Sequence, residues 1–209
     1  MDDARTPDTS RLATAIGVVA AGSVISLATY FAVGGPFGTI NDAGNAAIGV
    51  LGASLAWQLR RQILGRASGL ATAAALVGGA ITIVGSTLVI SRTTGFLFAG
   101  FVSSVGFAGI GAWLVVANRS RLATAWPRRL RRLGLAAGAL MIFGLVLVPG
   151  IALRLDDPAT APAWVWAGSI SWVGTYVAFP AWAIWMGRAD GRDATLALSS
   201  RVGRKAVTE

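Results

Sequence analysis

Long apolar runs separated by short polar segments dominate this chain. A helix needs about 20 apolar residues to cross roughly 30 Å of hydrocarbon, because each residue adds about 1.5 Å. Six stretches meet this requirement, at 12–34, 39–59, 69–91, 95–117, 133–153 and 162–187. Lipid cannot satisfy exposed backbone N–H and C=O groups, so each stretch is predicted to be helical. The pattern therefore predicts an all-α, polytopic membrane bundle with six transmembrane helices.

The predicted bundle leaves little of the chain for anything else. Residues 12–187 form the six-helix transmembrane domain, residues 1–11 an N-terminal tail and residues 188–209 a basic C-terminal tail. The first apolar stretch exceeds the 7–15 residues of a signal-peptide core, which predicts a retained helix. No separate soluble domain is expected.

Basic residues are divided unequally between the two sides of this predicted topology. Alternate connections receive 16 of the 18 Lys and Arg residues, whereas Arg92 and Arg154 are the two on the other side. Short cytoplasmic loops carry an excess of Lys and Arg, so both termini are predicted to be cytoplasmic. With the acidic residues included, the two sides carry about +10 and −1. We therefore expect a multi-pass protein of the cell membrane, oriented N-in and C-in.

The composition agrees with lipid as the solvent and excludes several kinds of chemistry. The 209 residues are 55% hydrophobic and 13% charged, against about 25% charged residues in ordinary soluble domains. The chain holds no Cys and no His, which excludes disulfides, thiolate nucleophiles and the commonest metal and haem ligand. The predicted spans also hold no carboxylate pair. We therefore expect no cofactor, no bound metal and no enzymatic activity.

The densest basic segment begins just after Trp126. Its four arginines are Arg128, Arg129, Arg131 and Arg132, hereafter the arginine run. At a membrane exit such a segment is predicted to lie on anionic lipid headgroups, each cation contributing about 1 kcal/mol. Docking of a cytoplasmic partner on the same surface is the alternative. Since the basic residues lie at membrane exits, the pI of 11.6 does not indicate nucleic-acid binding.

The second apolar stretch begins with the chain's most distinctive polar residues. Asn41 and Asn45 are four residues apart and so share a helix face, and Asp42 is the one ionisable residue within the predicted spans. Intramembrane ionisable residues are usually functional, so these three residues are candidates for a small polar pocket. The alternative is structural: Thr39 as N-cap with Asp42 at N3 would form a capping box, and the asparagines would bond to neighbouring helices.

A second polar face is predicted in the sixth stretch, which carries Ser171, Thr175 and Tyr176. Pro180 has no N–H to donate to the carbonyl of Tyr176, so the helix is expected to kink there. Beside such a kink, these three side chains are candidates for lining a cavity. A packed bend with its free carbonyl satisfied by a hydroxyl group is the alternative.

Other features of the apolar stretches are assigned structural roles. Trp164, Trp166, Trp182 and Trp185 lie near the ends of the sixth stretch, as an aromatic belt at the membrane surfaces predicts. Arg92 and Arg154 are expected to cap the outer ends of their helices, with Arg154 pairing with Asp156 or Asp157.

Small residues recur every four positions in several stretches and are expected to let helices pack closely within the bundle. The stripes are Ala74, Gly78, Thr82 and Ser86; Gly100, Ser104, Ala108 and Ala112; and Gly134 and Gly138.

Two functions remain open at this point. The polar faces predict a protein that binds or translocates a small neutral or amphipathic molecule. The alternative is a non-catalytic scaffold or accessory subunit, acting through helix packing and its cytoplasmic basic loop. Either function is compatible with a homo-oligomer or with a partner membrane protein.

Overall fold

The computed structural model describes residues 7–63, 66–120, 123 and 126–188, and the regular structure in these residues is helical. The greater part of the two predicted tails lies outside them. The first half of the chain forms four long helices: α1 (Pro7–Val33), α2 (Phe37–Leu59), α3 (Arg66–Ile90) and α4 (Phe96–Arg119).

The second half of the chain forms two interrupted helices. The first consists of α5 (Arg128–Phe143), the 3₁₀ turn η2 (Gly144–Leu147) and α6 (Val148–Ala152). After the 3₁₀ turn η3 (Pro158–Thr160), the last helix comprises α7 (Ala163–Gly168), α8 (Ser171–Val173), the π turn η4 (Gly174–Ala178) and residues 179–188. The irregular turns come just before or at Pro149 and Pro180, which cannot donate the backbone hydrogen bond of a regular helix. The interruption predicted at Tyr176 is thus a π turn.

Helix length and composition indicate a membrane protein. Four helical segments are long and apolar enough to cross a bilayer: Thr9–Val33, Ala67–Ile90, Phe96–Arg119 and Arg128–Ala152. Helix α2 has 23 residues, but Asn41, Asp42 and Asn45 lower its mean hydropathy. The last helix is divided by its turns. The two polar faces proposed as candidate sites therefore lie on α2 and on the last helix, which are not among these four segments.

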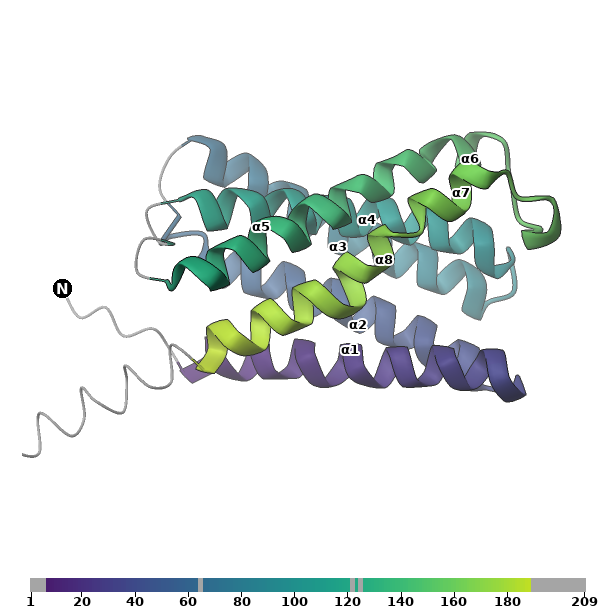
Figure 1. The fold of residues 1–209 in the computed structure, drawn as a ribbon, viewed down its shortest axis with the longest axis horizontal. Coiled ribbons are helices and arrows are strands. Elements are labelled where there is room, and N and C mark those ends of the chain that lie inside the picture. Colours follow the sequence, from purple (N-terminus) through teal and green to yellow (C-terminus); the bar gives the residue numbers. More distant parts are fainter. Residues whose placement is uncertain (1–6, 64–65, 121–122, 124–125, 189–209) are drawn as a thin grey trace, which may run out of the picture.

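Consecutive helices run in opposite directions, which gathers the connections at two ends of the bundle (Figure 1). Helices α2 and α4 end where α1, α3 and α5 begin. We call this the arginine-rich end, and its described arginines are Arg11, Arg60, Arg61, Arg66, Arg119, the arginine run and Arg188. The other end, called the opposite end, carries Arg92 and Arg154. Among the described residues, the arginines are therefore divided between the two ends as the sequence predicts.

Small residues bring neighbouring helices into close contact. A Cβ atom at Gly78 of α3 would collide with the carbonyl oxygen of Gly106 in α4, and one at Gly138 of α5 would lie 2.7 Å from that of Gly111. The close packing predicted for the third and fifth stretches is confirmed. In α4, however, Gly106 and Gly109 face α3, and Gly100 of the predicted stripe faces Trp172 instead.

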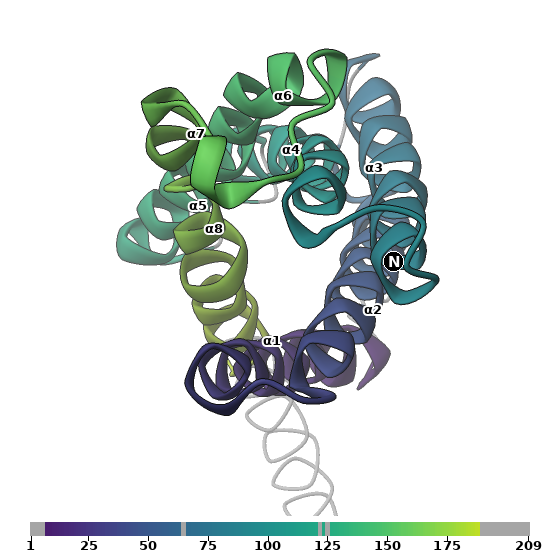
Figure 2. The same cartoon turned by 90° about the vertical axis from the view of Figure 1, so that its right-hand side faces the viewer.

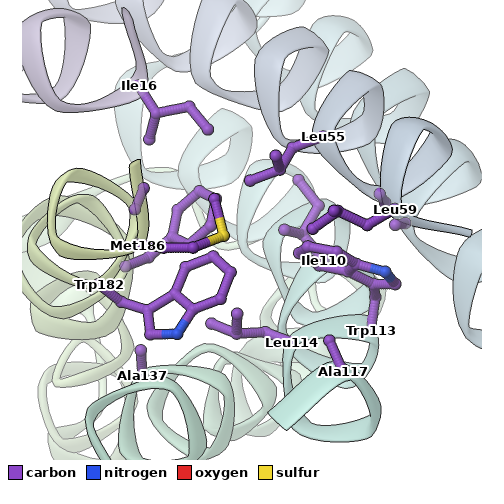
Figure 3. Close-up of a cluster of buried hydrophobic side chains, with 14 of the residues drawn as sticks. Ile16, Leu55, Leu59, Ile110, Trp113, Leu114, Ala117, Ala137, Trp182 and Met186 are labelled. Atoms are coloured by element: carbon purple, nitrogen blue, oxygen red, sulfur yellow. The ribbon is translucent and has the colours of Figure 1, made fainter. Parts of the chain in front are cut away.

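A core of buried side chains, among them Trp113 and Trp182, fills the half of the bundle nearer the arginine-rich end (Figure 3). Four of its aromatic residues form what we call the tryptophan cluster: Trp113, Trp126, Phe179 and Trp182. The ring centroid of Trp182 lies 5.7–6.2 Å from those of the other three. Its Nε1 donates to Oδ1 of Asn118 at 3.1 Å. Trp182 is fully buried, so its assignment to a membrane-surface belt is wrong. Trp126, 5% exposed, also faces the core although it precedes the arginine run.

Helix α1 and the last helix cross near the arginine-rich end. Ser10 Oγ donates to the carbonyl of Gly187 at 3.2 Å, and a Cβ at Gly187 would lie 3.0 Å from that of Ala13. Toward the opposite end the two helices separate, and Figure 2 shows α1 and α8 on different sides of the bundle axis. Polar side chains and aromatic rings lie between them there.

Candidate functional site

A cavity lies between α1, α2, α3, α4 and the last helix, in the half of the bundle nearer the opposite end. It contains about 430 Å³ of empty space, including the part open to the surroundings. Most of this space is too narrow for a water molecule, and the remainder holds about one or two of them. The polar lining residues are Asp42, Asn45, Ser103, Ser104, Thr175 and Tyr176, and the aromatic ones are Phe96, Phe107 and Trp172.

The two predicted polar faces meet in this cavity. The hydroxyl of Tyr176 donates to Oδ1 of Asn45 at 2.6 Å, which joins residues 131 positions apart in the chain. Tyr176 and Thr175 belong to the π turn, and π turns are frequent at functional sites.

Asp42 contributes a buried carboxylate to the cavity wall. Its side chain is 7% exposed and forms no ion pair within the described part of the chain. The capping-box interpretation is wrong, because α2 begins at Phe37 and its N-cap, Pro36, makes no side-chain cap bond. Gly34 and Gly35, with φ of +69° and +73°, turn the chain sharply into the helix before Thr39 is reached. Asp42 therefore lies beyond the first turn of α2.

The other two candidates do not line the cavity. Asn41 is 1% exposed and its Oδ1 has no hydrogen-bond partner. Ser171 is 2% exposed, its Oγ also has no partner, and it lies against Gly144 of η2.

Three aromatic rings from three separate elements form what we call the aromatic bridge: Phe31 of α1, Phe96 of α4 and Trp172 of α8. The centroids of Phe31 and Phe96 are 6.4 Å apart, those of Phe96 and Trp172 are 6.1 Å apart, and both pairs are edge-to-face. Trp172 Nε1 also lies 3.4 Å from Ser104 Oγ, to which it donates. No local sequence spacing connects these residues, so sequence reasoning did not assemble them.

Asp156 joins two connections at the opposite end. Its carboxylate accepts from the backbone N–H of Gly95 at 2.5 Å and from that of Phe98 at 3.1 Å, which caps α4 from a distant loop. Asp157 instead accepts locally from the N–H of Ala159 at 2.9 Å. The predicted ion pair of Arg154 with either acid is therefore wrong within the described residues.

Arg92 and Arg154 close the helices that precede them. Both have positive φ, 58° and 51°, at a position where glycine is usual. The N–H of Thr93 donates to the carbonyl of Leu88, and that of Leu155 to the carbonyl of Gly150. These bonds are the long bonds of Schellman motifs, so the two arginines end their helices through their backbone conformation.

The arginine run forms the first turns of α5 instead of preceding the helix. Three of its members have exposed side chains: Arg128, Arg129 and Arg132. Arg131 is partly buried, and its Nε has no hydrogen-bond partner.

Within the described residues, no three or more His, Cys, Asp or Glu side chains are grouped as a metal site requires. Comparison with protein-family models, with curated proteins and with solved structures gave no match to this chain. The functional argument therefore depends on the cavity and on the charge distribution.

Proposed function

We propose that this is a non-catalytic protein of the cell membrane that binds a small neutral or amphipathic molecule in the cavity. In this proposal six segments cross the bilayer, and α2 and the last helix are the two with polar faces. The arginine-rich end faces the cytoplasm by the positive-inside rule.

The observation that carries the proposal is the meeting of Asp42, Asn45, Thr175 and Tyr176 in one cavity. Polar groups inside a membrane protein are costly unless they serve packing or a ligand. Asp42 has no ion-pair partner in the described part of the chain, so its charge is not balanced by a neighbouring side chain there. A mixed polar and aromatic lining is typical of small-molecule sites.

The packing of the bundle limits how a ligand could reach the cavity. The tryptophan cluster fills the bundle on the side of the arginine-rich end with fully or almost fully buried side chains. A ligand would therefore enter from the opposite end and stop at the cluster. Translocation would require the cluster to open, because close-packed side chains leave no path.

A glycine substitution tests whether the cavity is the binding site. A Cβ at Gly100 would meet only Trp172, at 3.7 Å, so Gly100→Ala fits the fold while narrowing the cavity. Gly22→Ala is the matched control, because a Cβ at Gly22 has nothing within 4 Å. Both changes add the same methyl group to a long helix.

The purified full-length protein in detergent would be titrated with methylammonium, methanol, acetamide and glycerol, and binding followed by thermal unfolding and calorimetry. We expect at least one molecule to bind the wild type and Gly22→Ala equally. Gly100→Ala should weaken that binding about tenfold, as overpacking by one methyl group implies. Binding by none of them, or equal binding by both variants, would refute the proposal.

We also propose that the arginine run contacts anionic lipid headgroups, because three of its side chains are exposed at the start of α5. Replacing all four arginines with glutamine should reduce the number of anionic lipids that copurify with the protein, as mass spectrometry would measure. Unchanged lipid retention, combined with loss of a bound cytoplasmic protein, would favour the scaffold function instead.

A further inference from the structure

One carboxylate stands without a counter-ion in the wall of the cavity, and aromatic rings line the same space. We propose that the occupant of this cavity is a small protonated organic amine of about the size of methylammonium, an amphipathic molecule whose charge is held at Asp42. This inference rests on the proposed function, since it names the chemical class of the ligand in the same cavity.

The charge balance points to a ligand with a single positive charge. Asp42 is 7% exposed, and no Lys or Arg lies within ion-pair distance of it among the described residues. The other polar lining residues, such as Asn45, Ser103 and Thr175, are neutral. A monovalent cation would neutralise the site, whereas a divalent cation would leave a net buried charge at high cost.

The aromatic and apolar part of the lining favours an organic amine over a strongly hydrated metal cation. Phe96, Phe107 and Trp172 present aromatic rings to the cavity, and such rings attract ammonium groups through their electron-rich faces. An amine needs only a few acceptors for its N–H groups, and Asp42 and the hydroxyls of Ser103 and Thr175 provide acceptor oxygens in the lining.

The dimensions limit the amine to a small one. The cavity has room for about one or two water molecules, and the aromatic bridge lies across its wall. Ammonium and methylammonium have that size, whereas a tetraalkylammonium ion would have to displace Phe96 or Trp172. The charged residues toward the opposite end sum to −1, which does not oppose the approach of a cation. They are Arg92, Arg154, Asp42, Asp156 and Asp157.

Calorimetric titration of the purified full-length protein with methylammonium chloride tests the inference, with ionic strength held constant by tetramethylammonium chloride. Asp42→Asn removes the charge and keeps the shape of the side chain. Asp157→Asn is the matched control, because it removes an acid at the opposite end that contacts only its own turn. We expect saturable binding to the wild type and the control, and binding at least about tenfold weaker in Asp42→Asn.

A size series in the wild type makes the test independent of how well the variant folds. Ammonium and methylammonium should raise the melting temperature, and tetraethylammonium should not. A larger effect of tetraethylammonium would overturn the inference, and so would methylammonium binding that Asp42→Asn leaves unchanged. Sodium competing as strongly as methylammonium would overturn the assignment to an amine.

The neutral acetamide separates this inference from the proposed function. Suppose that acetamide binds, that Gly100→Ala weakens its binding and Asp42→Asn does not, and that methylammonium does not bind. The cavity is then a site for neutral molecules. The amine inference then fails and the proposed function stands. If neither molecule binds, both fail.

Discussion

Asp156 is predicted to hold the opposite end of the bundle together by capping α4 from another loop. Its carboxylate accepts two backbone N–H groups, at Gly95 and Phe98, where α4 has no side-chain cap of its own. Loss of a helix cap costs about 0.5–2 kcal/mol, and bonds to a charged acceptor lie at the upper end. Asp156→Ala should therefore lower the free energy of unfolding by about 2 kcal/mol.

For a chain of this length, 2 kcal/mol corresponds to a melting temperature lower by about 4–8 °C. Thermal unfolding in detergent, followed by circular dichroism, would measure this change. Asp156→Asn keeps an acceptor oxygen without the charge and should fall between the wild type and Asp156→Ala. Asp157→Ala, which breaks only the bond to Ala159, is the control and should cost less.

A double-mutant cycle tests the geometry itself. A Cβ at Gly95 would lie 2.6 Å from the Oδ1 atom of Asp156, so Gly95→Ala should displace the carboxylate and destabilise the wild type. In the Asp156→Ala background, Gly95→Ala should cost nothing further, because the two changes break the same contact. Additive losses, or a melting temperature of Asp156→Ala equal to that of the wild type, would refute the proposed cap.

Two other predictions concern stability. Trp182→Ala should lower the free energy of unfolding by about 3–5 kcal/mol, because the side chain is fully buried at the centre of the tryptophan cluster. Trp185, which is 40% exposed, provides the control variant Trp185→Ala. An equal loss of unfolding free energy in Trp185→Ala would contradict this account. Arg92→Gly and Arg154→Gly should each raise the free energy of unfolding by up to about 1 kcal/mol, because glycine adopts their positive φ without strain. The melting temperature of each variant should rise accordingly. No change in either variant would show that the arginine side chains offset the strain.

The helical segments could be predicted from the sequence because apolar run length is a local property. The positions that sequence reasoning assigned wrongly depend on three-dimensional packing. A tryptophan near a helix end suits a membrane surface as well as a core, and only the crossing of the last helix with its neighbours places Trp182 inside. The Asp156 cap joins residues about 60 positions apart in the chain, so nearby Arg154 was the only partner that the sequence suggested.

The candidate site was found in part. Asp42, Asn45, Thr175 and Tyr176 were nominated as polar residues in apolar stretches, which is a rule of composition. Their convergence required the fold, since Asn45 and Tyr176 lie on helices far apart in the chain. Ser171 was nominated by the same rule, yet it lies against Gly144 of η2, a neighbour that only the fold brings next to it.

The central claim is that a polar cavity opens only on the side away from the arginine-rich end. The chain has no cysteine, so Ser103→Cys, in the cavity wall, provides a single reactive thiol, and Ala117→Cys provides a control in the filled half. Intact cells and inverted membrane vesicles would be treated in nitrate buffer with silver ions, which bind thiols and are small enough for the cavity, with free cysteine on the far side to quench reagent that crosses the bilayer. The account predicts modification of Ser103→Cys from the outside alone and of Ala117→Cys from neither side. Modification of Ser103→Cys only from the cytoplasmic side, or from neither side, would contradict it.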